Sequence, residues 1–454
     1  MTADQGALCN RLEEIVGITH VAGGAAQIAA FVVDGTMPEL VVRPGTQDET
    51  ARVVRACAEA GAAMIPWGGG TAVGLGNSPA RADVVVQLDR LDRIVEWDAA
   101  NLCVTAEAGV RLAALQELVA RSKATLPLDP PERHRVTLGG MVAANQSGPG
   151  RLLHGTVRDW LLGMRVVLPD GERVRCGGRV LKNVSGYDMN KIFIKSMGTL
   201  GIVTEVTFKL MPVPAQRAAV IGLFPDPAEA WGVVAKALGS FLLPEALEFF
   251  NPEAMALLAP ALGAPAVPGA CGLAVALAGS RETVERQARD FAALFGEGGG
   301  KAVTLPSGPA GTAWEAIRNL TGGARTRHPG RTFCEITVPI SHAGALAAAA
   351  ARTGQNCGLQ SVVMAHAGSG VVWALFLPAP EPAPVDTLAG ALEGLRREAA
   401  AEEGSLVVLD APPAVKRRLD VWGPPGGGLG MMRRLKAEFD PRGLLNPGRF
   451  VGGI

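Results

Sequence analysis

A run of three glycines directly behind a strand-like segment is the feature that most limits what this chain can fold into. Residues 62–67 have the apolar composition of a short strand and lead straight into Gly68–Thr71. Phosphate binding needs several backbone N–H groups that converge on one spot, and side chains would block that approach. The loop from Pro66 to Gly74 is therefore the first candidate for a phosphate site.

Three more segments in the same half of the chain are poor in side chains. They are Thr137–Asn145, the pair Gly148–Gly150 and Gly155–Asp159, and Gly198–Glu205. Four stretches of bare backbone in one region indicate a single long cofactor that lies against the main chain. A turn-rich α+β domain without a ligand is the alternative. No Gly-x-Gly-x-x-Gly follows a strand, so a Rossmann-type dinucleotide site is not supported.

The composition excludes several classes of protein. The chain has 454 residues, of which 48% are hydrophobic, enough for two or three domains with sizeable cores. Lys+Arg and Asp+Glu both number 43, so no basic excess exists to neutralise a nucleic acid. We see no signal peptide and no apolar stretch of the roughly 20 residues that a membrane helix needs. The 7 cysteines lack CxxC spacing, so no iron–sulfur centre is predicted and a cytoplasmic location is expected.

Apolar periodicity and turn residues divide the chain into a lead-in and two larger parts. Residues 1–35 begin with a helix, because apolar residues recur at helical spacing near the N-terminus. A βαβ unit follows, in which Thr46 and Glu49 form a capping-box signature. The Met-Pro-Val-Pro run at 211–214 predicts a boundary, beyond which strands alternate with Ala-rich helices. We therefore expect domains at 36–214 and 215–454.

These segments, in this order, resemble the FAD-binding domain of the vanillyl-alcohol oxidase and p-cresol methylhydroxylase (PCMH) family. The likeness covers about residues 38–214 and implies an α+β, two-subdomain fold. In that family a loop like Pro66–Gly74 holds the FAD pyrophosphate. Segments like Thr137–Asn145 and Gly155–Asp159 lie along the flavin, and one like Gly201–Val203 contacts the nucleotide half.

The resemblance also implies which residues bind FAD and how the cofactor is held. Some relatives link FAD covalently through a His in the glycine loop, whereas Thr71 stands there in this chain, which implies non-covalent FAD. The implied FAD-binding residues are Pro66, Gly68, Gly69, Gly70, Thr71, Gly74, Thr137, Gly139, Gly140, Ala143, Asn145, Gly155, Arg158, Asp159, Gly201, Ile202, Val203 and Asn446.

The remainder of the chain resembles the α+β C-terminal, or substrate-side, domain of FAD-linked oxidases such as D-lactate dehydrogenases and glycolate oxidase. The ending Phe439–Phe450 is typical of that group and implies that about the last 35 residues return to the FAD site. The stretches Gly178–Asp188 and Asp420–Pro425 look like the smaller FAD-binding subunit of glycolate oxidase. That smaller subunit works in a complex with a second flavin subunit and an iron–sulfur subunit.

One motif of the catalytic relatives is largely lost here. They carry His-x-Gly-Asp-Gly-Asn-x-His, whose histidines and acid help to build a metal or base site. Residues 366–373 match it as His-Ala-Gly-Ser-Gly-Val-Val-Trp, so Ser369 replaces the acid, Val371 the amide and Trp373 the second His. A site with one remaining ligand would be very weak, and no metal is predicted.

Few other side chains stand out as candidates for chemistry. His366 and Tyr187, the only tyrosine, are weak candidates for the base that hydroxy-acid oxidation needs, and packing explains both as well. His134 is expected in an exposed loop rather than at a phosphate. A cluster of three arginines is a candidate clamp for a carboxylate. These are Arg325, Arg327 and Arg331, while Trp67, Trp160 and Trp373 are expected in the core.

The leading hypothesis is that the chain, like that smaller glycolate oxidase subunit, is the FAD-binding component of a glycolate or 2-hydroxy-acid dehydrogenase complex. Such a chain would take a small 2-hydroxy acid, pass electrons to the second flavin subunit and the iron–sulfur subunit, and meet a membrane only through these partners. Two alternatives remain open. One is a self-sufficient FAD-dependent D-lactate or 2-hydroxy-acid dehydrogenase, and the other is a non-catalytic structural subunit.

Overall fold

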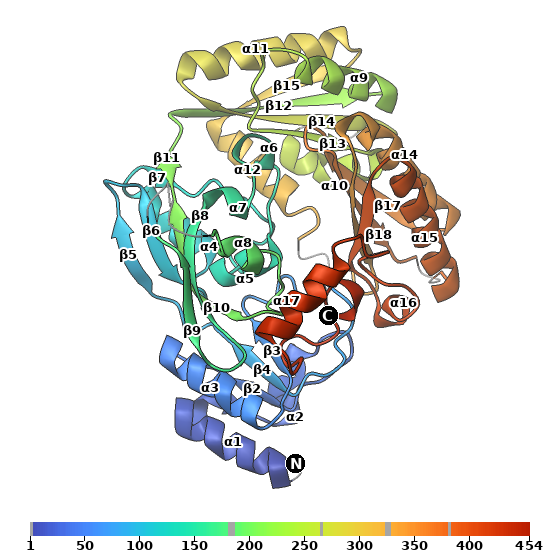
Figure 1. Ribbon diagram of the computed structural model, residues 1–454. Helices are drawn as coiled ribbons and strands as arrows, with labels where there is room; N and C mark the ends of the chain where they lie inside the picture. Colours follow the sequence, from blue (N-terminus) through green and yellow to red (C-terminus); the bar gives the residue numbers. More distant parts are fainter. Residues whose placement is uncertain (1–2, 180–186, 264–266, 323–327, 380–382) are drawn as a thin grey trace.

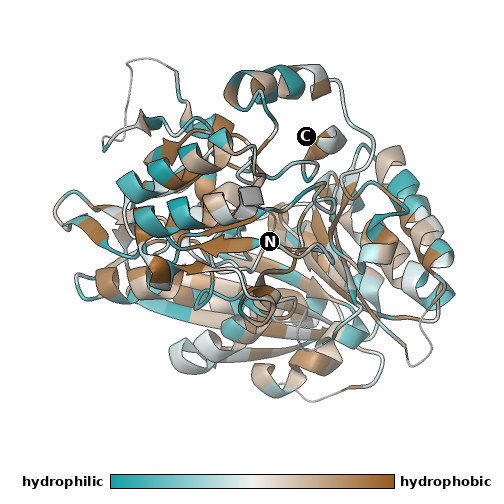
Figure 2. Ribbon diagram, turned by 90° about the horizontal axis from the view of Figure 1, so that it is seen from below, coloured by the Kyte–Doolittle hydropathy of each residue, from teal (hydrophilic) through white to brown (hydrophobic). Residues whose placement is uncertain are grey.

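Three main sheets, each covered by helices, make up the protein (Figure 1). The computed structural model describes residues 3–179, 187–263, 267–322, 328–379 and 383–454. Colouring by hydropathy shows the hydrophobic strands inside and the hydrophilic turns of the helices outside (Figure 2). The sheets therefore carry the buried cores on which the loops of the site are mounted.

The first sheet follows the helical lead-in and forms the βαβ unit that precedes the glycine loop. Its strand order is β1 (Val21–Ala22), β2 (Leu40–Val42), β4 (Val84–Gln87) and β3 (Met64–Trp67). Strands β2, β4 and β3 are parallel, so their carboxyl ends meet at one edge. The helices on this sheet are α1 (Ala3–Val16), α2 (Ala25–Ile28) and α3 (Gln47–Glu59), with 3-10 turns at Ile18–His20 and Ala29–Phe31.

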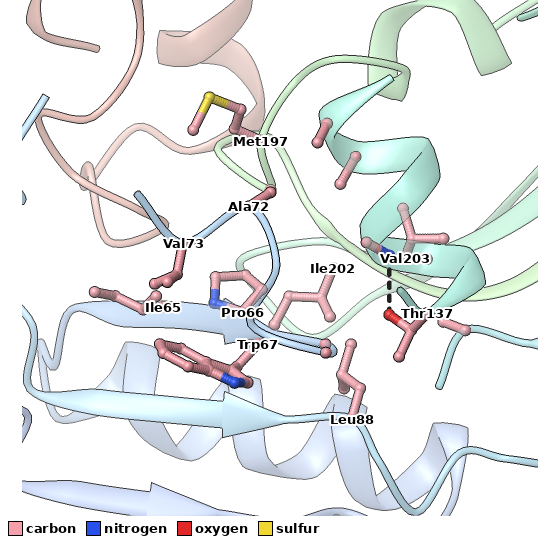
Figure 3. Close-up of a pocket in the computed structure, with 18 of the residues that line it drawn as sticks. Ile65, Pro66, Trp67, Ala72, Val73, Leu88, Thr137, Met197, Ile202 and Val203 are labelled. Atoms are coloured by element: carbon pink, nitrogen blue, oxygen red, sulfur yellow. Dashed lines mark hydrogen bonds between the residues drawn. The ribbon is translucent and has the colours of Figure 1, made fainter. Parts of the chain in front are cut away.

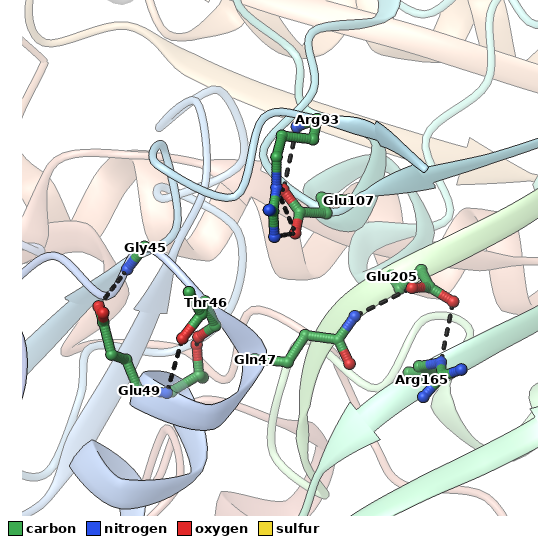
Figure 4. Close-up of polar contacts among 9 residues, drawn as sticks. Gly45, Thr46, Gln47, Glu49, Arg93, Glu107, Arg165 and Glu205 are labelled. Carbon is green, nitrogen blue, oxygen red and sulfur yellow. Dashed lines mark hydrogen bonds and ion pairs between the residues drawn. The ribbon is translucent and has the colours of Figure 1, made fainter. Parts of the chain in front are cut away.

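Helix α3 begins where the capping signature predicts. The Glu49 backbone N–H donates to Thr46 Oγ1 at 3.0 Å, and the Gly45 backbone N–H donates to Glu49 Oε2 at 2.7 Å (Figure 4). The apolar residues of α3 then bury against β2 and β4, together with Leu12 of α1. The predicted lead-in helix and the predicted cap are both confirmed.

The second sheet is antiparallel and follows the first in the chain. Its strand order is β5 (Ile94–Asp98), β6 (Cys103–Glu107), β10 (Ile202–Lys209), β8 (Leu161–Val167) and β9 (Arg173–Gly177). Its helices are α4 (Leu112–Ala120), α5 (Leu138–Ala144), α6 (Arg151–His154), α7 (Val157–Trp160) and α8 (Asn190–Phe193). A short pair, β7 (Ala124–Thr125) and β11 (Met211–Pro212), lies at its margin.

Glu205 of the second sheet accepts one hydrogen bond from α3 of the first sheet and one from a neighbouring strand of its own sheet. Gln47 Nε2, on α3, donates to Glu205 Oε2 at 2.9 Å, and Arg165 Nε, on β8, donates to Glu205 Oε1 at 3.0 Å (Figure 4). Because Glu205 lies on β10, these bonds fix α3 relative to the antiparallel sheet. The first sheet, which leads into the glycine loop, is thereby fixed next to the second sheet.

The third sheet belongs to the C-terminal half and is antiparallel throughout. Its strand order is β15 (Lys301–Pro306), β12 (Gln216–Phe224), β14 (Cys271–Gly279), β13 (Ala246–Phe250), β17 (Gln360–His366), β18 (Val371–Leu377), β16 (Thr332–Thr337) and β19 (Ser405–Asp410). One face packs against α9 (Pro227–Leu238), α11 (Arg281–Glu297), α14 (Ala343–Asn356) and α15 (Val385–Ala401). The other face packs against α10 (Pro252–Leu262) and α12 (Ser307–Arg318). On β12 the two faces alternate, with Val220 on one and Ile221 on the other.

The C-terminal segment returns from the third sheet to the first. It contains α16 (Pro413–Lys416), α17 (Leu429–Phe439) and a 3-10 turn at Val451–Gly453. Another 3-10 turn, Ile340–His342, lies between β16 and α14 of the third sheet. The backbone N–H of Met64 donates to Leu444 O at 2.7 Å, and that of Asn446 donates to Met64 O at 2.9 Å. The last residues thus lie beside β3, where the glycine loop starts. The predicted domain limits at 36–214 and 215–454 stay a prediction.

A buried ion pair ties α16 to the lead-in. The side chains of Lys416 and Asp34 are 0% exposed, and Lys416 Nζ lies 2.8 Å from Asp34 Oδ2. Burial lowers the pKa of Lys416, and the charge of Asp34 opposes that shift. The same ammonium donates to Gly74 O at 2.5 Å and Gly76 O at 3.1 Å. All three of its donors are therefore used.

We expect Lys416→Met to lower the free energy of unfolding by about 3–5 kcal/mol, because it leaves the buried Asp34 carboxylate without this cation. The matched control Lys236→Met, at an exposed position of α9, should change it by no more than about 0.5 kcal/mol. Urea unfolding measures both. Asp34 has a left-handed φ of 49°, which asparagine tolerates. The double variant Lys416→Met/Asp34→Asn should therefore recover part of the loss, and no recovery would contradict a charge-based cost.

Candidate functional site

The carboxyl end of β3 opens into a cavity lined mainly by backbone and small side chains (Figure 3). Trp67 and Val73 lie on its glycine-loop side, and Ile202 and Val203 face it from β10. Met197 and Asn446 close it from two other segments. Each predicted region except the pair Gly148–Gly150 and Gly155–Asp159 therefore reaches one concave surface, hereafter the loop cavity.

The glycines of the loop are required by close approach to residues 135–137. A Cβ on Gly69 would lie 1.8 Å from Arg135 O, and one on Gly68 would lie 2.3 Å from Thr137 Oγ1. Thr137 in turn caps α5, because its Oγ1 accepts from the Gly140 backbone N–H at 3.3 Å. Any side chain at these positions would push apart the two segments that form the cavity.

Two buried cations hold the descending part of the loop. Arg449 Nη2 donates to Val73 O at 2.5 Å and to Leu75 O at 2.6 Å. Lys416 holds the carbonyls of Gly74 and Gly76 in the same way. Four successive carbonyl oxygens, which would repel a phosphate, are thus bonded to cations from the C-terminal segment.

A second cavity adjoins the first and faces the third sheet. The two share Gly70, Thr71, Ala72, Leu75 and Ala144. On the sheet side the wall is formed by half-buried side chains of β16 and β19 and by Trp373 of β18. The shared residues make this sheet-side cavity a continuation of the loop cavity.

The residues that are present fit FAD. The loop cavity offers bare backbone beside a hydroxyl, as a pyrophosphate requires. In the sheet-side cavity the amide oxygens Asn145 Oδ1 and Gln146 Oε1 are buried and accept no hydrogen bond from the described residues. Buried acceptors need a donor, and a ring N–H of a bound flavin would supply one.

The structure brings together most of the predicted FAD-binding residues. Gly70 and Thr71 line both cavities, and Gly74 and Asn145 line the sheet-side cavity. The residues at the loop cavity alone are Pro66, Gly68, Gly69, Thr137, Gly139, Gly140, Ala143, Gly201, Ile202, Val203 and Asn446.

Gly155, Arg158 and Asp159 line neither cavity. Their segment serves the start of α7, where Thr156 and Asp159 form a capping box and the Thr156 backbone N–H donates to Asp159 Oδ2 at 2.7 Å. A Cβ on Gly155 would collide with that carboxylate. The glycine is therefore explained by local helix capping, and the structure does not support a cofactor role for these three residues.

Neither weak candidate for the base lies at the cavities. The Tyr187 side chain is 93% exposed, so the structure gives no support to its approach to a flavin. His366 is 2% exposed, and its Nδ1 lies 2.8 Å from Glu248 Oε2. Burial raises the pKa of Glu248, and His366 opposes that shift. His366 Nε2 has no hydrogen-bond partner among the described residues, so this side chain is a core histidine that is only half satisfied.

The remaining predicted side chains have mixed outcomes. Arg325, Arg327 and residues 180–186, within the stretch that resembles the smaller glycolate oxidase subunit, lie outside the described residues. Arg331 lines the sheet-side cavity, where Arg331 Nη2 lies 2.7 Å from Asp410 Oδ2. His134 is exposed, as expected. Trp373 is buried, and Trp160 packs against the hydrophobic core of the second sheet. Trp67 also borders the loop cavity, and Trp373 borders the sheet-side cavity.

Several cavity residues were missed by sequence reasoning. Arg449 belongs to the typical C-terminal ending, and a charged residue in so apolar a context was a usable signal. Met197, Ala108 and Leu75 carry no such signal, because only the packing of three separate segments brings them to the loop cavity. The same holds for three charged residues of the sheet-side cavity, Arg151, Lys195 and Glu335.

Asp129 supports the turn that leads into α6. Its carboxylate accepts the Gly150 backbone N–H at 3.2 Å on Oδ1 and 3.0 Å on Oδ2. Burial raises the pKa of Asp129 to about 6, and the Arg318 charge opposes the shift. Because α6 carries Arg151 into the sheet-side cavity, this turn positions part of the cavity wall.

The described part of the chain offers neither a membrane helix nor a metal cluster. Within it, no helix has the length and apolar character needed to cross a membrane. Among the same residues, no three His, Cys, Asp or Glu side chains gather in a group that could hold a metal ion.

Two family models match this chain. Residues 38–177 match an FAD binding domain, and residues 213–407 and 424–450 match the C-terminal domain of FAD linked oxidases. Glycolate oxidase subunit GlcD of Bacillus subtilis (strain 168) is 28% identical over 427 residues, which cover 91% of this chain and 89% of that protein. Mitochondrial D-2-hydroxyglutarate dehydrogenase of Bos taurus is 28% identical over 90% of this chain and 76% of its own length.

Solved structures of flavoproteins share the fold. Substrate-bound p-cresol methylhydroxylase superposes with a TM-score of 0.80 at 18% identity, over 99% of this chain and 97% of that one. The 4-ethylphenol oxidase from Gulosibacter chungangensis gives a TM-score of 0.79 at 19% identity, over the same shares of 99% and 97%. The fold is thus a PCMH-type FAD-binding domain followed by an FAD-linked oxidase C-terminal domain, as predicted, and FAD is the cofactor.

We expect Ala143→Phe to abolish FAD binding, because the ring would fill the loop cavity that Ala143 borders. The matched control Ala348→Phe, at an exposed position of α14, should bind FAD as the wild type does. Titration of the apoprotein with FAD, followed by quenching of flavin fluorescence, measures both. Equal affinities would contradict the assignment of this cavity.

The shifted pKa of Asp129 predicts a pH-dependent stability difference. Between its unfolded value near 3.8 and about 6, the folded state binds more protons, so the Asp129 contribution to stability falls as pH rises through that window and is lowest at pH 7. Asp129→Asn removes this penalty and keeps an acceptor for Gly150. We expect the variant to gain about 1–3 kcal/mol over wild type between pH 4 and pH 7 in urea unfolding. A pH-independent difference would contradict the shift.

Proposed function

We propose that this chain, which belongs to the FAD-linked oxidases and is an FAD-dependent oxidoreductase, acts on small 2-hydroxy acids. The observation that carries the proposal is the continuity of the bare-backbone loop cavity with a charged sheet-side cavity. A cofactor held in the first can present its ring to a polar substrate in the second. The names of the relatives, which include a glycolate oxidase subunit and D-2-hydroxyglutarate dehydrogenase, support this class of donor.

The chain's own residues bind and shelter the reactants. Bound FAD would accept a hydride from the substrate carbon. The backbone of Gly68–Thr71 would hold the pyrophosphate, while Lys416 and Arg449 donate hydrogen bonds to the carbonyls of the following loop residues. Trp373 and the apolar side chains of β16 and β19 line one wall of the sheet-side cavity. Thr71, where some relatives have a linking His, favours non-covalent binding.

We further propose that the chain works as the FAD-binding component of a glycolate-oxidase-like complex. The loss of the His-x-Gly-Asp-Gly-Asn-x-His motif at residues 366–373 favours dependence on a second flavin subunit and an iron–sulfur subunit. The Bacillus subtilis relative is subunit GlcD, so the finer likeness to the smaller FAD-binding subunit stays a prediction. A self-sufficient dehydrogenase is the second candidate, favoured by the charged side chains of the sheet-side cavity.

The test is an absorbance spectrum of the purified chain, recorded before and after anaerobic addition of glycolate or D-lactate. We expect flavin bands, because the chain binds FAD, and bleaching by a hydroxy acid that gives up its hydride. Bleaching of the chain alone favours the self-sufficient enzyme, and bleaching only after partner subunits are added favours the complex. A protein that binds FAD but is bleached under neither condition would contradict the proposed donors.

A further inference from the structure

Four cationic side chains line the sheet-side cavity, and two of them are already paired. Arg135 Nη1 lies 2.9 Å from Glu132 Oε1, and Arg331 Nη2 lies 2.7 Å from Asp410 Oδ2. The other two are Arg151 and Lys195, and neither forms an ion pair with a described residue. Two uncompensated cations in a cavity favour an anionic ligand there.

The backbone at each of these two residues is held in place, although the Lys195 side chain is exposed. Arg151 opens α6 directly after the turn that Asp129 supports. Lys195 has a left-handed φ of 64°, an uncommon conformation for lysine, and its backbone N–H donates to Val142 O at 3.2 Å. Arg151 also acts on Glu248, since its charge opposes the raised pKa of that carboxyl, but the two form no ion pair.

A carboxylate faces the cavity from the third sheet. Glu335 of β16 is half-buried and lines the cavity beside Phe333 and Trp373. Trp373 Nε1 donates to Glu335 Oε2 at 3.1 Å, which orients the carboxylate. Glu335 Oε1 accepts no hydrogen bond, and no cation pairs with Glu335, among the described residues. It is therefore a carboxylate with one oxygen available to a ligand.

We propose that Arg151 and Lys195 anchor the carboxylate of a 2-hydroxy acid and that Glu335 accepts the proton of its hydroxyl group. This rests on the proposed function. It assigns to the sheet-side cavity a catalytic set of its own in place of the histidine motif that is lost at residues 366–373. The anchor comes from the FAD-binding half and the base from the C-terminal half, so the set is complete only when both halves pack together.

The step balances without another reactant. The substrate carbon loses a hydride, which oxidised FAD accepts, and the hydroxyl oxygen loses a proton, which passes to Glu335. The carbon–oxygen bond becomes a carbonyl, so the product is a 2-oxo acid. Phe333, Val407 and Leu409 offer an apolar wall to the substrate's side group, which favours D-lactate over glycolate.

The test uses the FAD-bound protein and three variants, Arg151→Met, Lys195→Met and Glu335→Gln. Pyruvate, which cannot be oxidised in this step, is titrated against the flavin spectrum to give a dissociation constant. Anaerobic mixing with D-lactate gives the rate of flavin reduction, and the midpoint potential is measured for each protein. Arg352→Met and Glu398→Gln, at an exposed ion pair between α14 and α15, are the matched controls.

Each anchor variant should weaken pyruvate binding by about 10-fold or more at an unchanged midpoint potential. Glu335→Gln should slow flavin reduction by about 100-fold or more while pyruvate binding stays within a few-fold of wild type. The controls should match wild type in every measurement.

The remaining outcomes distinguish failure of the anchor, failure of the base and failure of the proposed function. Shifted midpoint potentials with unchanged pyruvate affinity would mean that the two cations face charge on the cofactor, which overturns the anchor. D-lactate reduction at the wild-type rate in Glu335→Gln overturns the base and leaves the proposed function standing. A wild type that binds pyruvate but is not reduced by D-lactate or glycolate, either alone or with the partner subunits added, contradicts the proposed donors and the base together, and keeps only the anchor. A wild type that neither binds pyruvate nor is reduced by D-lactate or glycolate, alone or with the partner subunits, overturns the anchor, the base and the proposed donors.

Discussion

The close approach of the glycine loop to residues 135–137 is the contact on which the rest of the structure depends. Gly69 lies so near Arg135 O that a Cβ would be 1.8 Å away, so only bare backbone can pass. This contact brings the end of β3 beside the start of α5 and opens the loop cavity between them. Arg449 and Lys416 then fix the far side of the loop from the C-terminal segment. One cavity therefore uses residues from both ends of the chain.

Because side chains alternate between the two faces of the third sheet, every second residue on its last strands faces the sheet-side cavity. On β19, Leu406 and Val408 are buried under helices, whereas Val407 and Leu409 point to the sheet-side cavity. On β16, Glu335 likewise faces the cavity from between buried neighbours. A polar group on an otherwise apolar sheet face, opposite unpaired cations of the FAD-binding half, is an arrangement suited to an anionic substrate.

Local patterns were enough to predict much of the fold. The Thr46–Glu49 cap and the lead-in helix depend on residues close together in the chain, and both are confirmed. The glycine loop lies directly behind β3 at a cavity, and its role as the phosphate site stays a prediction. Gly155 shows the limit of that reasoning, because a glycine beside a capping box looks in sequence like one beside a cofactor. Arg151, Lys195 and Glu335 could not be predicted as a set, because only tertiary packing carries β16 to the FAD-binding half.

A crystal structure of the protein saturated with FAD tests the central claim most directly. The account predicts electron density for the pyrophosphate against the backbone of Gly68–Thr71, with the flavin ring reaching the sheet-side cavity near Asn145. It also predicts the Lys416 and Arg449 contacts to the loop carbonyls unchanged. FAD density at another place, or a loop cavity without density in the saturated protein, would contradict it.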